Sequence, residues 1–561
     1  MFNFLRDKDK WNRVRNEDVF KFLRDLLFSE YETLCKDKEI PQLPFSLWMD
    51  FVKTGDRKNF EDLYFLRRKQ MSVYAILSMI YPEKDEYILR LQDILCEILN
   101  EYSWCVPAHL PADRLNSKTQ IDLFAAETGL YMAEIKYMLA DRLNPLITER
   151  ITEELDKRII NSFRNNTYAF EQYRSNWASV CGGAVGIVLL YENPDAYIEL
   201  KPRIEKCMAH YLESIGEDGS VSEGAAYWAY GFGFYILYND MLKRYTFDRI
   251  DYFKNKKVEN IANFFSGMCM SNSNVYSFAD SSKGLGYNIA NLYYLNNRFG
   301  VSVPPLKYGG ISVNKFSWTI RSFLYYNPEI SGEGIKNGVS YYENLQCYID
   351  RKDKYAFAVK GGHNKEEHNH NDVGSFVIVA DDKQILCDLG APIYTAHTMS
   401  KKAYDDVLEK ASFGHNVPII NGKGQGYGRE YCGELMVNDN EISVDMKDAY
   451  LIKPDKLLRR FDLEEDRIRL TDEVEGVENF TERFVSEIKP EIESGCVRLD
   501  CMTINFNTKD FTASYEAVET LFHSGEERTV YLIDISGKND KKQIEITFEF
   551  SKNTTRNGET L

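Results

Sequence analysis

The hydrophobic period of the chain changes once, near residue 330, and this change constrains the fold more than any other feature of the 561 residues. Before it, apolar residues recur every three or four positions, as in 88–98 and 147–159, which is the spacing of one buried helix face. After it they alternate, as in 442–446 and 544–550, which is the pattern of strands with one buried face. Helices followed by strands disfavour a βαβ order and predict an α+β protein with an antiparallel sandwich as its second half.

The length of the chain also requires more than one domain, because 561 residues exceed what a single hydrophobic core organises. We expect a helical domain over 1–328 and an antiparallel β domain over 341–561. The stretch 329–340 contains three glycines and no periodicity, so it is predicted to be the linker.

The formal net charge of −17 argues against a nucleic-acid binder or an anionic-membrane binder, because no overall positive field attracts phosphates. It also weighs against an anionic substrate, unless basic residues gather locally.

The eleven cysteines are scattered, which predicts reduced thiols rather than disulfides. The first residues lack the apolar core of a secretory signal and no segment is apolar enough to span a membrane, so we expect a cytoplasmic enzyme, or a periplasmic or secreted one if a signal has been removed.

Histidines gather in one part of the expected β domain. Of eight in the chain, five lie within about fifty residues: His363, His368, His370, His397 and His415. His368 and His370 are two positions apart, which on a strand would direct both side chains to one face. Asp388 follows an apolar run, and two imidazoles with one carboxylate suit zinc. The alternative is a set of hydrogen-bonded histidines at a domain interface.

Several motifs around these residues are similar to those of one enzyme family. They are GGHNKEEHNHNDVGSF, CDLGAPIYT and FGHNVPIING in the β half, and RSNWASVCGG and DGSVSEGAAYWAYG in the helical half. Together they resemble the heparinase II/III family of polysaccharide lyases over residues 104–430. The resemblance implies an incomplete (α/α) toroid followed by antiparallel β-sheets, with a glycan cleft between them.

The resemblance also implies a metal site. Its ligands map onto His370, Asp388 and His415, which would hold one divalent ion, zinc by its donor set, in a supporting role. His368 would then face the cleft as a catalytic residue.

Two residues of the helical half take catalytic roles by the same resemblance. Asn176 would neutralise the substrate carboxylate, and Tyr227 would protonate the leaving oxygen and, for one epimer, also take the C5 proton. Tyr230 competes for the role of Tyr227, because residues three apart share a helix face. Several family members have histidine after the catalytic Asn, whereas this chain has Trp177, so a second base is missing.

Further residues are kept as possible catalytic or substrate-binding groups. These are Glu223, Tyr394, His109 and Arg114, and we also consider the cations Lys118, Lys401, Lys402 and Arg429 as contacts for acidic groups.

The function expected from these motifs is β-elimination in a uronic-acid-containing glycan, with glycosaminoglycans favoured. The partner would be an acidic polysaccharide or oligosaccharide, and a homo-oligomer stays open. The alternatives are an alginate-type lyase of the same fold, a glycoside hydrolase that uses Glu223 and Asp280 as paired carboxylates, and a non-catalytic carbohydrate-binding protein.

Overall fold

A computed structural model shows the chain as two compact units, each described here by itself. The described residues are 2–111, 116–222, 224–280, 284, 287–330, 332, 334–366, 368–395, 397–438, 441–537 and 542–551. The helical unit comprises Met1–Ile215, Tyr227–Ala262 and Gly286–Gly332, and the strand unit comprises Gly216–Ala226, Asn263–Leu285 and Glu333–Leu561. Two segments of the range expected to form the helical domain are thus part of the strand unit, and the first strand of that unit begins at Gly338, within the range expected to be a linker.

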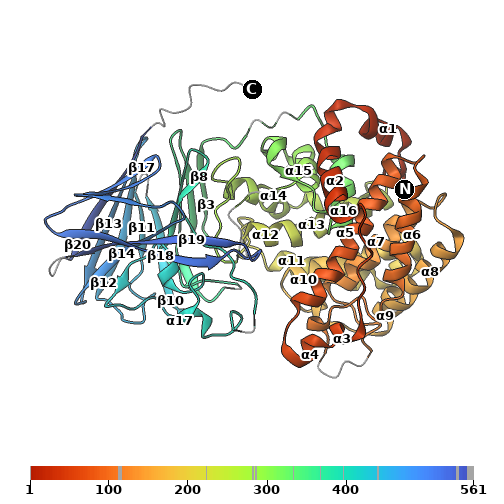
Figure 1. Cartoon of the computed structure of the whole chain (residues 1–561), viewed down its shortest axis with the longest axis horizontal. Helices are drawn as coiled ribbons and strands as arrows, with labels where there is room; N and C mark the ends of the chain where they lie inside the picture. Colours follow the sequence, from red (N-terminus) through yellow and green to blue (C-terminus); the bar gives the residue numbers. More distant parts are fainter. Residues whose placement is uncertain are drawn as a thin grey trace. The chain divides into compact units, whose positions relative to one another are not determined.

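The helical unit is built mainly from α-helices (Figure 1). They are α1 (Lys8–Asn16), α2 (Lys21–Leu34), α3 (Phe45–Trp48), α4 (Asp50–Thr54), α5 (Lys58–Ile80), α6 (Asp85–Leu99), α7 (Leu123–Met138), α8 (Pro145–Leu155), α9 (Asn161–Asn165), α10 (Asn176–Glu192), α11 (Pro194–Glu213), α13 (Gly233–Tyr245), α15 (Ile289–Phe299) and α16 (Phe316–Tyr325). Two more, α12 (Ala225–Tyr227) and α14 (Lys256–Met268), continue from one unit into the other. The short strands β1 (Tyr287–Asn288) and β2 (Gly309–Gly310) pair in parallel.

Helix α10 forms the centre of the helical unit and packs against α7, α11 and α13. Glycines on α10 permit this close packing, because a Cβ at Gly182 would lie 2.5 Å from Cys207 Cβ and one at Gly186 would lie 2.7 Å from the Tyr238 ring. The apolar stripe predicted over 88–98 is buried in α6, so the helical spacing read from the sequence is confirmed there.

The described residues of the strand unit form three antiparallel sheets (Figure 1). The first has the order β3-β4-β5-β7-β8, the second β15-β16-β17-β20-β13-β12-β11-β10-β6, and the third β18-β19-β14-β9. The bounds are β3 (Gly338–Tyr342), β4 (Cys347–Arg351), β5 (Ala356–Lys360), β6 (Gly362–Asn364), β7 (Phe376–Ala380), β8 (Lys383–Leu386), β9 (Ile419–Ile420), β10 (Gly428–Asn438), β11 (Glu441–Asp445), β12 (Lys456–Leu463), β13 (Arg467–Glu475), β14 (Phe480–Ser486), β15 (Glu491–Glu493), β16 (Cys496–Leu499), β17 (Met502–Phe506), β18 (Phe511–Leu521), β19 (Glu527–Gly537) and β20 (Gln543–Phe550). A short helix, α17 (Ala403–Asp406), lies between β8 and β9.

The inner faces of the sheets share one aromatic core. Phe376 on β7 contacts Phe461 on β12, Phe484 on β14 and Phe548 on β20, with ring centroids 5.1, 6.0 and 5.9 Å apart. Buried and exposed residues alternate along β12 and β13, as the period of two requires. The predicted α+β class with an antiparallel sandwich is therefore confirmed.

Two further expectations concern the whole chain. All eleven cysteines are free, and most are buried, as predicted. In the part of the chain that the structure describes, no helix has the combination of length and apolar character needed to cross a membrane.

Candidate active site

Four buried side chains of the strand unit converge on one point. His370 and Asp372 come from the segment between β6 and β7, Asp388 follows β8, and His415 follows a short 3-10 turn before β9. One nitrogen or oxygen atom of each lies within 4.8 Å of the others. This metal group could hold a cation. It contains the three residues expected from the sequence and adds Asp372, which sequence reasoning missed although the residue stands inside the H-N-H-N-D motif.

In both His370 and His415, Nε2 takes part in a hydrogen bond outside the metal group, so Nδ1 is the nitrogen that remains for a metal ion. Nε2 of His370 lies 3.1 Å from Asp280 Oδ1, and Nε2 of His415 lies 2.9 Å from the carbonyl oxygen of Glu409. A proton on Nε2 satisfies both contacts and places the lone pairs on Nδ1. Nδ1 of His370 and Oδ2 of Asp372 are buried without a hydrogen-bond partner among the described residues. The donor set therefore fits a bound cation, because an ion would satisfy both atoms.

Asp388 and His415 shift each other's pKa. Burial by itself raises the pKa of Asp388, but the neighbouring His415 outweighs it and lowers that pKa below its ordinary value. Burial likewise opposes protonation of His415, and Asp388, 3.1 Å from its Nδ1, raises the pKa of the imidazole. Asp372 accepts a hydrogen bond from Lys360 at 2.8 Å.

The backbone around the metal group is fixed by Asn416 and Arg459. The Asn416 amide donates to the carbonyl oxygens of Phe376 and Cys387, which start β7 and precede Asp388. The Arg459 guanidinium donates to the carbonyl of Asn416 at 2.8 Å, and it also contacts two buried acidic side chains, Asp472 at 2.6 Å and Glu482 at 2.7 Å.

Asp280 connects the metal group to two candidate catalytic side chains. Its Oδ2 lies 2.8 Å from Nδ1 of His368 and accepts the hydroxyl of Tyr394 at 2.9 Å, while its Oδ1 meets His370. Burial raises the pKa of Asp280, but the hydrogen bonds from His368 and His370 hold it well below the ordinary range, so the group is a carboxylate. Sequence reasoning missed this role of Asp280 and considered it only as a hydrolase carboxylate.

The expectation that His368 and His370 lie on one strand is wrong. Both are in the irregular segment between β6 and β7, and His368 has a φ of +57°, in the left-handed region. The two side chains nevertheless reach the same carboxylate, because this backbone reversal turns them toward Asp280.

Asn176 and the two candidate tyrosines lie close together in the helical unit. Asn176 is the buried first residue of α10. Ser179 on α10 donates to the carbonyl of Gly231 at 2.8 Å, and a Cβ at Gly231 would lie 3.0 Å from Asn176 Cβ. Gly231 belongs to a π-helical turn, Trp228–Phe232, that follows Tyr227 directly.

Tyr230 is held by an acidic and a basic side chain. Its hydroxyl donates to Glu127 at 2.5 Å, and the ammonium of Lys315 lies 4.2 Å from its ring centroid. Desolvation of the phenol, followed by the charge of Glu127, raises the pKa of Tyr230 well above its ordinary value. Tyr230 is therefore held protonated; Tyr227, at the end of α12, is half-buried, as Tyr230 is.

His109 lies beside the residue that follows Asn176. Its Nδ1 is 2.8 Å from Asp122 Oδ2, and its ring stacks on Phe124 with centroids 5.4 Å apart. The Trp177 ring is 5.0 Å from the same imidazole. Asp122 is also the N-cap of α7 and accepts the amide of Ala125 at 2.7 Å, so the histidine is oriented by a fixed carboxylate.

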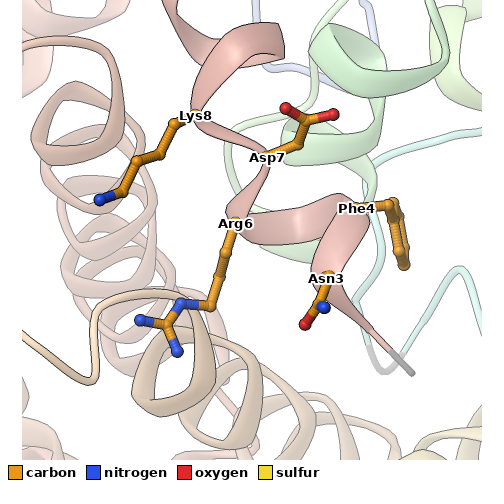
Figure 2. Close-up of a pocket in the computed structure, with 5 residues that line it drawn as sticks. All are labelled: Asn3, Phe4, Arg6, Asp7 and Lys8. Carbon is orange, nitrogen blue, oxygen red and sulfur yellow. The ribbon is translucent and has the colours of Figure 1, made fainter.

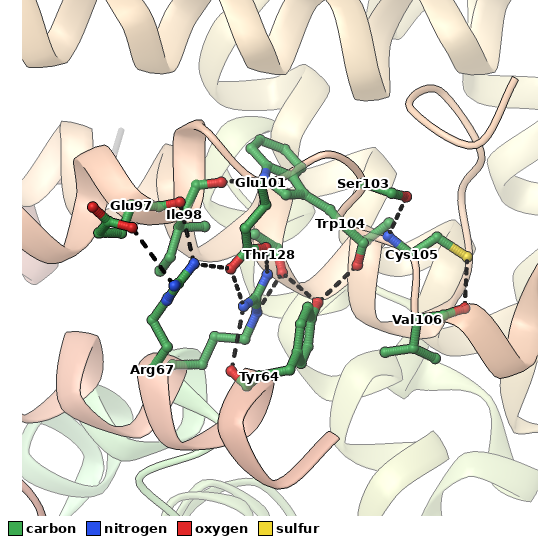
Figure 3. Close-up of polar contacts among 12 residues, drawn as sticks. Tyr64, Arg67, Glu97, Ile98, Glu101, Ser103, Trp104, Cys105, Val106 and Thr128 are labelled. Carbon is green, nitrogen blue, oxygen red and sulfur yellow. Dashed lines mark hydrogen bonds and ion pairs between the residues drawn. The ribbon is translucent and has the colours of Figure 1, made fainter. Parts of the chain in front are cut away.

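A buried ionic network holds the segment that leads to His109 (Figure 3). Arg68 donates to Glu101 at 2.7 and 2.9 Å, and Arg67 reaches the same carboxylate at 3.0 Å. The hydroxyl of Tyr64 donates to the carbonyl of Trp104 at 2.7 Å. Because these side chains come from α5, they fix residues 101–106 against that helix.

The remaining candidates are either outside the described residues or exposed. Glu223 and Arg114 lie outside the described residues. The cations Lys118, Lys401, Lys402 and Arg429 are exposed. A pocket of about 440 Å³ lies at the N-terminal residues Asn3, Phe4, Arg6, Asp7 and Lys8 (Figure 2), and it contains none of the candidate residues.

One family model matches the second half of the chain. Residues 342–553 match the family model described as "Heparinase II/III-like, C-terminal". Comparison with curated protein sequences gives no match.

Solved structures share the fold over nearly the whole chain. A heparan sulfate lyase HepC mutant from Pedobacter heparinus has a TM-score of 0.61 at 10% identity, covering 98% of this chain and 91% of that one. Heparinase III has a TM-score of 0.63 at 13% identity, covering 88% and 78%. Chondroitin AC lyase from Streptomyces coelicolor A3, in complex with chondroitin sulphate, has a TM-score of 0.58 at 8% identity, covering 98% and 82%. The resemblance read from the motifs is confirmed, and so is the fold of a helical toroid followed by antiparallel sheets.

Proposed function

We propose that this chain is a polysaccharide lyase that cleaves a uronic-acid-containing glycan by β-elimination, with glycosaminoglycans as the favoured substrates. The observation that carries the proposal is the orientation of His368 by Asp280; His368 lies in the part of the chain that matches the heparinase II/III-like model, and Asp280 lies outside it. The similarity in fold to a heparan sulfate lyase and a chondroitin lyase supports the substrate class.

The reaction requires a base, an acid and a group that neutralises the uronate carboxylate. The base takes the proton from C5, the electron pair forms the C4–C5 double bond, and the C4–O bond breaks as the leaving oxygen gains a proton. Asn176 is assigned to the carboxylate, where negative charge develops. Tyr227 is assigned as the acid that protonates the leaving oxygen.

His368 is assigned as a second acid–base residue, in addition to Tyr227. A proton on Nδ1 satisfies the contact with Asp280, so the lone pair is on Nε2, which can accept a proton. Tyr394 donates to the same carboxylate and is assigned a secondary role in positioning it.

His109 is proposed to contact substrate near Asn176. The chain has Trp177 where several family members have histidine, and the His109 ring packs on that tryptophan. Asp122 orients the imidazole. His109 thus places an imidazole beside Trp177, the position at which several family members have histidine.

We further propose that the metal group binds one divalent ion, Zn²⁺ by its donor set, through His370, Asp372, Asp388 and His415. Two imidazoles and two carboxylates give four nitrogen and oxygen donors, the number that tetrahedral zinc takes. When bound, the ion supplies a fixed positive charge that holds the surrounding loops. One carboxylate oxygen of Asp280 contacts the His370 ring and the other contacts the His368 ring, so Asp280 orients both rings.

The alternatives have less support. Hydrolysis needs two carboxylates beside the scissile bond, but the oxygens of Asp280 are already engaged with three donors. No observation favours alginate over glycosaminoglycans or a purely binding role.

The net charge of −17 favours a lightly sulfated or unsulfated glycan. The appearance of a conjugated double bond on incubation with uronate glycans tests the function.

A further inference from the structure

Two lysines of the strand unit are buried, and their ammonium groups have different surroundings. Lys360 is 8% exposed and donates to Asp372. Lys410 is 3% exposed, but within the described ranges its ammonium has neither a hydrogen-bond acceptor nor a carboxylate at ion-pair distance. Although the residue is largely buried, its Nζ is not among the fully buried atoms that lack a partner, so solvent reaches it and an anion there would gain a charge-assisted contact.

The backbone of Lys410 is fixed beside the metal group. Its carbonyl accepts the amide of Asn371 at 2.9 Å, and the carbonyl of the preceding residue, Glu409, is the acceptor for His415. The ammonium lies 5.0 Å from the ring centroid of Tyr404, whose hydroxyl is 3.5 Å from Asn369. Lys410 therefore lies against the segment that carries His368 and His370.

The charge of Lys410 also acts on Asp280. Burial raises the pKa of this carboxyl, the hydrogen bonds from His368 and His370 lower it, and the charge of Lys410 lowers it further. The two charges therefore attract each other, although no hydrogen bond or ion pair joins them among the described residues.

We propose that Lys410 is the cation of a subsite in the strand unit that receives the anionic group, carboxylate or sulfate, of an acidic sugar bound beside His368 and Tyr394. A lysine ammonium is a compact point charge, which suits an anion that it meets from one side. The inference deepens the proposed function, on which it rests for the sugar as ligand. Although the net negative charge of the chain disfavours an anionic ligand, Lys410 supplies a local positive charge.

A neighbouring lysine provides a matched control. Tyr404 stacks on Tyr427 with ring centroids 4.1 Å apart, and the ammonium of Lys365 lies 4.4 Å from the Tyr427 ring. Lys365 therefore contacts the same tyrosine pair, but it is exposed and its ammonium donates to the Tyr427 hydroxyl.

The test measures the melting temperature of the metal-loaded full chain during titration with glucuronate, with N-acetylglucosamine 6-sulfate and with glucose as the neutral control. The variants are Lys410→Met, Lys410→Gln, Lys410→Arg and Lys365→Met. We expect at least one of the two anionic sugars to stabilise the wild type, and which one does so distinguishes carboxylate from sulfate. In Lys410→Met and Lys410→Gln, the sugar concentration that gives half of the rise in melting temperature should increase at least about tenfold, the loss expected for one charge-assisted hydrogen bond. Lys410→Arg and Lys365→Met should be stabilised by the sugar as the wild type is.

Two results would overturn the inference. One is a wild type that neither anionic sugar stabilises more than glucose does. The other is an equal response in Lys410→Met, Lys410→Gln and wild type, which would leave Lys410 as a counter-charge to the buried carboxylates. A wild type that binds glucuronate through Lys410 but forms no conjugated product would remove the lyase function and keep the subsite.

Discussion

Oδ1 of Asp280 lies 3.1 Å from Nε2 of His370, and Oδ2 of the same carboxylate lies 2.8 Å from Nδ1 of His368. One side chain thus orients both a metal-group imidazole and the candidate catalytic imidazole. Loss of this carboxylate should therefore disturb metal binding and catalysis together.

Asp280→Asn should weaken metal binding by about 10- to 100-fold, because the amide holds the His370 ring less firmly than the carboxylate does. Competition with a chromophoric chelator measures the affinity, and the wild type should bind one divalent ion per chain. Asp406→Asn is the control, since Asp406 is partly exposed and pairs with His397. Equal affinities in both variants would contradict the role of Asp280.

Tyr227→Phe should lower kcat by about 10²- to 10⁴-fold, because it removes the proposed general acid. Tyr230→Phe should keep most of the activity, and its main effect should be a loss of about 1 kcal/mol of stability through the missing bond to Glu127. Steady-state rates and thermal melting of both variants separate these effects. A larger loss of kcat in Tyr230→Phe would exchange the roles of the two tyrosines.

Gly231→Ala should reduce kcat more than it reduces stability. The added Cβ would lie 2.8 Å from the Tyr211 ring and 3.0 Å from Asn176 Cβ, so Asn176 must shift. Gly310→Ala is a suitable control in the same unit, because nothing lies within 4 Å of its added Cβ. If both variants keep wild-type kcat, the position of Asn176 is not critical to the reaction.

Glu482→Gln should flatten the pH dependence of stability. Burial and the charge of Asp472 raise the pKa of Glu482 well above its ordinary value of 4.5. Above that value the unfolded chain has lost this proton while the folded chain keeps it, so the free energy of unfolding falls as the pH rises toward the raised pKa.

The measurement is urea unfolding at a series of pH values above 4.5. Glutamine keeps an acceptor for Arg459 and carries no charge, so the decline should be smaller in the variant. Glu473→Gln is the comparison, because pairing with Lys456 lowers the pKa of Glu473 and its contribution is lost only as the pH falls. A decline in Glu482→Gln as steep as in the wild type would contradict the assignment.

The order of the elements and most of the metal group could be predicted because their signals are local. The change of period near residue 330 depends on neighbours in sequence, and His370, Asp388 and His415 stand in short motifs. Asp280 could not be found in this way, because it lies 88 and 90 residues from the histidines that it contacts. Such a contact depends on how distant segments pack, which no periodicity encodes.

Reasoning from neighbouring residues in the sequence also gave the wrong backbone conformation at two positions. A straight strand was expected at His368, but a positive φ turns the backbone there, and only the packing around Asp280 specifies that turn. The π-helical turn Trp228–Phe232 similarly interrupts the spacing that would place Tyr227 and Tyr230 on one helix face.

The most direct test of the central claim is the ultraviolet absorbance of the metal-loaded protein during incubation with heparan sulfate, chondroitin, hyaluronan and alginate, with reducing ends counted in parallel. The account predicts that absorbance from a conjugated double bond rises with at least one glycosaminoglycan, in proportion to the new reducing ends, and that Tyr227→Phe abolishes the rise while Tyr230→Phe does not. Reducing ends that accumulate without any absorbance would show hydrolysis and contradict the assignment of this chain as a lyase.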